Sequence, residues 1–223
     1  MTRGFGISRV ARVAACGTAI AAMVVAAGAP AGAAMSPNLL KNGTAEAAAG
    51  GTGGVVNVPG WTRETGTDFT AVKYGSPNFP STTAPAPPNR GKNFFAGGPA
   101  DSTFPDQVAV QNISLSKYVT KIKGGKVTFT IAGWFGGNGR SKDAALMEVD
   151  FKNASGGLIS GGKTVGNVTE AQRGGKTELL HRLTTAKVPA GARSVFVQLI
   201  FDGSGTGYNN GYADNVTLTL SGV

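Results

Sequence analysis

The chain has 223 residues, with 21 basic and 12 acidic side chains and a formal net charge of +9. Its basic residues are scattered and do not alternate with aromatic side chains, which argues against nucleic acid as a partner. With one cysteine, Cys16, and one histidine, His181, the chain cannot form an internal disulfide or a Cys/His zinc cluster. Beyond the N-terminal leader, no stretch approaches the roughly 20 apolar residues of a membrane-spanning helix.

Residues 1–34 have the features of a secretory signal peptide. Three arginines precede an alanine-rich apolar run, and small residues at its end suit signal peptidase. The VAAC motif ending at Cys16 resembles a lipoprotein box, so a lipid-anchored form is an alternative, but the apolar run continues past that cysteine. Cleavage leaves 18 basic and 12 acidic residues, a net charge of +6. A basic exported protein can associate with anionic wall polymers, but the scattered charges favour a soluble basic surface.

Residues 35–223 show the alternation that is typical of strands with one buried face. In residues 126–134, for example, Val127, Phe129 and Ile131 alternate with threonines. Further short strands are expected at residues 58–63, 69–74, 107–115, 144–152, 177–188, 193–201 and 216–220. No stretch has sustained helical periodicity, and turn signals recur every ~8–12 residues. The sequence therefore predicts one all-β domain, a two-sheet antiparallel β-sandwich of the jelly-roll type.

Three segments are less regular. Residues 76–91 carry five prolines, which exclude a helix or an inner strand and predict either an ordered extended loop or a mobile arm. In residues 107–115 the apolar positions change phase, which predicts a strand that is buried on both sides or bulged. Residues 207–214 are rich in glycine and asparagine and are expected to form a polar loop before the last strand.

Three motifs together resemble a known family. Residues 38–46 (NLLKNGTAE), Trp61 and residues 211–218 (GYADNVTL) resemble the galactose-binding-domain-like jelly rolls, which include many carbohydrate-binding modules of secreted bacterial proteins. The resemblance covers most of the chain after the leader. It implies a non-catalytic, lectin-like module that is secreted to the cell exterior, where it binds carbohydrate or a cell-wall polymer.

The resemblance also implies a structural calcium ion. In such modules the N-terminal Asn-Gly turn and the aspartate before the last strand commonly meet at calcium, which places Asn42, Glu46 and Asp214 around the ion. Carboxylate and carbonyl oxygens are the ligands that calcium prefers. The alternative is that Glu46 and Asp214 cap turns or pair with basic side chains.

Glycans in these modules are held by aromatic rings and by amide or carboxylate groups. The candidates in this chain are Trp134, Tyr208, Tyr212, Asn209, Asn210, Arg140 and Asp143. Trp134 follows an alternating strand and fits a core position as well as a binding position. The middle strands lack a dense aromatic platform, so a soluble chain end or a wall glycan is expected rather than crystalline polysaccharide.

The sequence offers little for catalysis, so we expect no enzyme activity. Glu148 and Asp150 share one strand face and could serve a glycoside hydrolase, but a solvated pair of carboxylates explains them as well. The second alternative is a wall- or matrix-associated interaction protein without a defined glycan site. In each case a monomer is expected.

Overall fold

The strands form because side chains alternate between a buried and an open face. In β5 (Thr128–Gly137), Phe129, Ile131 and Phe135 are buried while Thr128 and Thr130 face outward. The structure, a computed structural model, describes residues 34–223 except 65, 101–104, 160–162 and 206. The predicted signal peptide, residues 1–34, lies outside the described residues apart from Ala34, and it stays a prediction.

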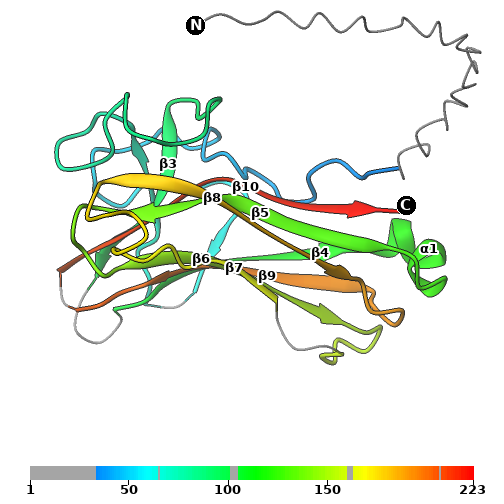
Figure 1. Ribbon diagram of the computed structural model, residues 1–223. Coiled ribbons are helices and arrows are strands. Elements are labelled where there is room, and N and C mark those ends of the chain that lie inside the picture. Colours follow the sequence, from blue (N-terminus) through cyan, green and yellow to red (C-terminus); the bar gives the residue numbers. More distant parts are fainter. Residues whose placement is uncertain (1–33, 65, 101–104, 160–162, 206) are drawn as a thin grey trace, which may run out of the picture. The chain divides into compact units, whose positions relative to one another are not determined.

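Two five-stranded antiparallel sheets pack face to face (Figure 1). Sheet A contains, in spatial order, β2 (Thr70–Lys73), β3 (Asn93–Ala100), β10 (Gly207–Ser221), β5 and β8 (Glu178–Lys187). Sheet B contains β1 (Thr62–Arg63), β4 (Gln107–Ser114), β9 (Ser194–Asp202), β6 (Ala144–Lys152) and β7 (Lys163–Gly166). The predicted all-β, two-sheet sandwich is confirmed.

The polar segment expected to be a loop, residues 207–214, is instead the first half of β10. This half pairs with β3 on one side and β5 on the other, where Gly98, Gly136 and Gly137 lie opposite it. Because glycines have no side chain, the three strands approach closely and hold the polar residues in a ladder. Bulges interrupt the register, and Asn215 adopts a positive φ of 47° in one of them. Backbone pairing thus overrides the composition of a loop.

Two smaller expectations also change. The strand with mixed phase, β4, is neither doubly buried nor bulged: Gln107, Ala109 and Gln111 are buried, and the residues between them are half-exposed. The apparent change of phase arises because Gln111 is a buried polar side chain. One short helix, α1 (Val119–Lys123), follows a 3-10 turn (Ser116–Tyr118) and joins β4 to β5. Five residues are too few to show helical periodicity.

The proline-rich segment, residues 76–91, is an ordered loop that covers the outer face of sheet A. Under it lies a satellite cluster, separate from the main core between the sheets, built around Tyr74, Phe94, Leu179 and Tyr212. Leu179 N donates a hydrogen bond to Pro85 O at 2.9 Å and so fixes the loop to β8. The loop therefore gives sheet A a second buried face at this end.

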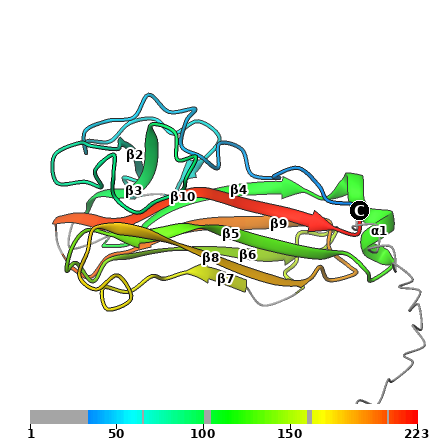
Figure 2. The same cartoon turned by 45° about the horizontal axis from the view of Figure 1, so that its top comes forward.

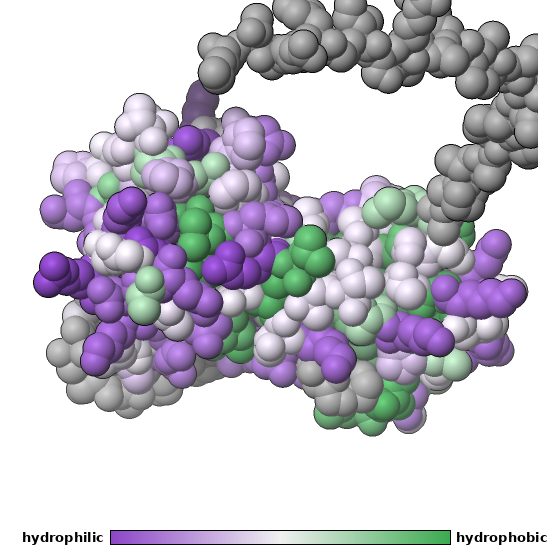
Figure 3. Space-filling model, viewed as in Figure 1, coloured by the Kyte–Doolittle hydropathy of each residue, from purple (hydrophilic) through white to green (hydrophobic). Residues whose placement is uncertain are grey.

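The loops that flank β2 and β3 lie at one end of the sandwich, which we call the loop end, whereas α1 and the C-terminus lie at the other end (Figure 2). On the face in Figure 3 the loop end is largely hydrophilic, and apolar residues form small separate spots. Among the described residues, no helix is long and apolar enough to cross a membrane.

Candidate functional site

A cavity opens at the loop end, where the start of β10 meets two loops of the N-terminal half. Its volume is about 450 Å³. The residues that line it are Thr52, Gly53, Pro77, Asn78, Phe79, Tyr208 and Asn210. We call it the end cavity. It brings together two predicted site residues, Tyr208 and Asn210, with five that the sequence did not indicate.

Two aromatic rings form the wall of the end cavity. Phe79 and Tyr208 meet edge to face, with ring centroids 5.3 Å apart and an interplanar angle of 72°. The Tyr208 hydroxyl is buried and has no hydrogen-bond partner among the described residues. Burial raises the pKa of this hydroxyl above its ordinary value, so it keeps its proton and can donate. A buried donor without a partner costs roughly 1–3 kcal/mol.

Gly53 sets how closely the loops approach each other in this wall. Its φ is +129°, and a Cβ atom there would lie 3.0 Å from the Phe79 ring. Both the backbone conformation and the close ring require glycine. Asn210 completes the rim: its Nδ2 donates to Tyr208 O at 2.9 Å, and its Oδ1 accepts from the Tyr212 hydroxyl at 3.2 Å.

Asp143, predicted as a ligand residue, fastens the loops behind the cavity. Its Oδ1 accepts hydrogen bonds from the amide and hydroxyl of Ser204 at 2.7 and 2.6 Å, and its Oδ2 accepts from Asn210 N at 2.8 Å. Burial alone would raise the pKa of Asp143, but these hydrogen bonds outweigh it and hold the pKa below its ordinary value. Both oxygens of the carboxylate therefore accept hydrogen bonds from the protein itself.

The other predicted ligand residues do not line the end cavity. Asn209 is 2% exposed, and its Nδ2 donates to Phe201 O and Pro105 O. Tyr212 is buried in the satellite cluster, and half-buried Trp134 packs against that cluster. Arg140 is exposed on the turn between β5 and β6. Backbone groups and rings, rather than open space, surround the first three side chains.

Arg173 is a structural residue that the sequence analysis missed. It is 1% exposed, and its guanidinium donates to four carbonyl oxygens, at 2.6–3.1 Å, of Gly137, Gly139, Ser141 and Lys176. It therefore ties the turn at residues 138–142 to the turn that precedes β8. An arginine in a polar, glycine-rich segment has no sequence signature that separates it from a surface arginine.

Asp214 is buried, at 0% exposure, beneath the proline-rich loop. Its carboxyl accepts hydrogen bonds from the Tyr74 hydroxyl at 2.8 Å and from Asn215 N at 2.7 Å. Burial raises the pKa of Asp214 to about 8, the charge of Glu46 adds to the rise, and the two hydrogen bonds and Arg90 oppose it. A carboxyl group buried in this way is largely protonated at neutral pH.

The three residues implied for calcium differ in how well they fit the ion. The charge of Glu46 raises the pKa of Asp214. The Oε1 atom of Glu46 accepts hydrogen bonds from the backbone amides of Lys92 and Asn93, both at 2.8 Å. Next to it, Asn93 Oδ1 is a buried oxygen without a hydrogen-bond partner among the described residues. Asn42 instead shapes a turn, where its Oδ1 accepts from Ala47 N and its carbonyl from Trp61 Nε1. Two carboxylates and one oxygen without a hydrogen-bond partner are the kinds of ligand that a hard cation prefers. The described residues contain no group of three or more His, Cys, Asp or Glu residues that could hold a metal ion.

Glu148 and Asp150, the carboxylates of the hydrolase alternative, are half-buried on the outer face of sheet B. They lie opposite Gln198 and Phe196 of β9. Neither carboxylate lines the end cavity.

No protein-family model and no curated protein matches the chain. A cyclase from Fischerella sp. TAU matches with a TM-score of 0.54 and 13% identity, over 85% of this chain and 99% of the cyclase. TmCBM61, solved with beta-1,4-galactotriose, gives a TM-score of 0.44 at 13% identity, over 82% and 98%. The enzymatically active domain of bacteriophage CBA120 tailspike protein 4 gives 0.48 at 15% identity, over 81% of this chain but 21% of that one. At 13% identity the likeness to the cyclase shows the fold alone, a two-sheet β-sandwich.

Proposed function

We propose that the protein is a secreted, non-catalytic carbohydrate-binding module whose sugar site is the end cavity. The observation that carries this proposal is the pairing of two rings, Phe79 and Tyr208, with amide groups at the rim of one cavity. Aromatic rings pack against the apolar face of a sugar, and amides both donate to and accept from its hydroxyls. None of the described residues that line the cavity is charged, which favours a neutral sugar over an anionic wall polymer.

Binding of residues 35–223 to a glycan array tests this proposal, and we expect neutral oligosaccharides to bind. Tyr208→Ala removes one ring and should weaken binding about tenfold or more, the effect of losing ~1.4 kcal/mol. Phe196→Ala is the matched control, because Phe196 is a half-buried ring on the outer face of sheet B. Equal affinities of the two variants would contradict the assignment of the site.

The conservative variant Tyr208→Phe isolates the hydroxyl. Because this hydroxyl has no partner among the described residues, its removal should leave the melting temperature of the free protein unchanged or slightly raised. If a sugar oxygen accepts from it, affinity should fall several-fold. Unchanged affinity would assign recognition to the rings and amides alone.

The same experiments separate the alternatives. A protein that binds no glycan on the array but pellets with cell wall, in a salt-sensitive way that survives Tyr208→Ala, is a wall-associated interaction protein. Turnover of a glycoside that disappears in Glu148→Gln would instead support the hydrolase.

We also propose that calcium binds between the exposed carboxylate of Glu46 and the buried carboxyl group of Asp214. Glu46, Asp214 and the Oδ1 atom of Asn93 are the groups that would hold it. Calcium would add positive charge beside an ionised Asp214, on which Arg90 already acts. Because a ligand that binds only the folded state raises stability, calcium should raise the melting temperature and a chelator should lower it. Asp214→Asn should abolish this difference, and Glu148→Gln, on the other sheet, should preserve it.

A further inference from the structure

A groove runs along the outer edge of β4, on the opposite side of sheet B from β7. β1 pairs with β4 only through Thr62 and Arg63, which lie opposite Val110 and Ala109. Before Thr62 the chain turns away at residues 59–60, so nothing in the described part of the chain occupies the next strand position. The groove left there has a volume of about 510 Å³.

The exposed edge of β4 offers unpaired backbone groups to this groove. Leu115 N donates to Arg193 O on the β9 side, whereas Val108 O accepts from Glu64 N on the β1 side. Since these directions alternate along an antiparallel strand, the backbone groups of Asn112 and Ser114 point into the groove. In the described residues no hydrogen bond uses them on that side. Their N–H and C=O groups have the spacing of a β-ladder, which an extended polypeptide matches.

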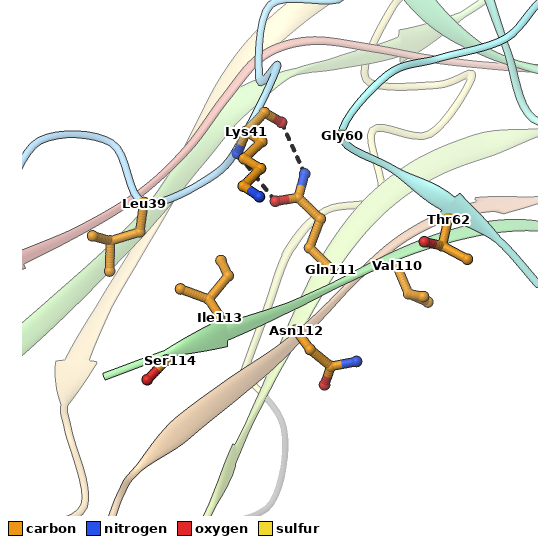
Figure 4. Close-up of a pocket in the computed structure, with 9 residues that line it drawn as sticks. All are labelled: Leu39, Lys41, Gly60, Thr62, Val110, Gln111, Asn112, Ile113 and Ser114. Atoms are coloured by element: carbon orange, nitrogen blue, oxygen red, sulfur yellow. Dashed lines mark hydrogen bonds between the residues drawn. The ribbon is translucent and has the colours of Figure 1, made fainter. Parts of the chain in front are cut away.

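The rest of the groove also suits a strand. Leu39 and Ile113, both half-buried against the main core, form an apolar floor, as Figure 4 shows. The far wall is fixed, because Gln111 holds the backbone of Lys41 through two hydrogen bonds at 3.0 and 2.8 Å. The Lys41 side chain is exposed at the rim, and no described acidic residue lines the groove.

We propose that this groove binds an extended segment of another polypeptide, which adds a strand to sheet B beside β4. Backbone hydrogen bonds to Asn112 and Ser114 hold the segment. Its inward side chains, apolar at alternate positions, lie on Leu39 and Ile113, and an acidic residue pairs with Lys41. This site lies on a different part of the fold from the end cavity and does not depend on sugar binding.

A blocked synthetic peptide of alternating valine and threonine with one aspartate is the probe. At saturation we expect amide hydrogen exchange to slow at Asn112 and Ser114, and to stay unchanged at Ala109, which already pairs with β9. N-methylation of the two peptide amides that face β4 should weaken binding about tenfold, because each hydrogen bond contributes ~0.5–1.5 kcal/mol. N-methylation on the opposite peptide edge should have no effect.

Two protein variants complete the test. Asn112→Pro removes one edge donor and none of the bonds to β9, and it should weaken binding several-fold without lowering the melting temperature. Leu39→Ser should weaken binding even if the proline variant does not fold. No peptide binding, or binding without slowed exchange at Asn112 and Ser114, would overturn the proposal. A peptide-free dimer that Asn112→Pro dissociates would assign the edge to a second copy of the chain instead.

Discussion

Replacing Arg173 by leucine should destabilise the protein strongly, mainly through the loss of its hydrogen bonds to backbone carbonyl groups. Of its four hydrogen bonds to carbonyl groups, the one to Gly137 O is buried and the other three are partly buried. A buried carbonyl left unpaired costs about 1–3 kcal/mol, and each partly buried bond contributes ~0.5–1.5 kcal/mol. The sum predicts a loss of about 3–5 kcal/mol in the free energy of unfolding.

Thermal unfolding measures this loss. For a domain of this size 1 kcal/mol corresponds to roughly 2–4 °C, so the melting temperature of Arg173→Leu should fall by about 10 °C. Arg182→Leu is the control, because Arg182 makes one exposed hydrogen bond, to the carbonyl of His181, and such surface changes stay within about 0.5 kcal/mol. A melting temperature of Arg173→Leu equal to that of the control would refute the structural role of the guanidinium.

Three further predictions concern stability. Asp143→Asn should lower the free energy of unfolding by about 2 kcal/mol. Because the folded pKa of Asp143 is lowered, the wild-type protein should be more stable than this variant above about pH 4 and should lose that difference at more acid pH. In the presence of a chelator, protonated Asp214 should contribute fully to stability below about pH 4 and lose that contribution as pH rises toward about 8, because its folded pKa is raised. Asp214→Asn should remove this part of the profile of stability against pH, and an unchanged profile would show that another group titrates. Phe94→Ala should cost about 3–5 kcal/mol by opening the satellite cluster, whereas Leu183→Ala, at 59% exposure, should cost little; equal losses would mean that the proline-rich loop does not seal the cluster.

The sequence predicted the sandwich because alternation is a local property. Val127, Phe129 and Ile131 share one face of a strand whatever lies beside it, so a period of two residues and frequent turn signals were enough to indicate two sheets. The resemblance to the galactose-binding-domain-like jelly rolls, together with the glycine-rich composition of residues 207–214, placed Tyr208 and Asn210 among the candidate ligand residues. It could not supply Phe79, since a single ring in a proline-rich segment has no periodicity and faces the cavity only after the loop folds over sheet A.

Tertiary structure decided which polar residues the fold itself uses. Three polar residues that would be expected in exposed loops are buried against backbone groups: Asn209, Asp143 and Arg173. The glycine-rich strands approach so closely that backbone N–H and C=O groups are buried between them, and these groups need hydrogen-bond partners. Residues 207–214 became a strand for the same reason. The alternation of side chains, readable in the chain, fixed the two sheets, whereas the contacts between distant loops fixed the end cavity, the buried Asp214 and the open edge of β4.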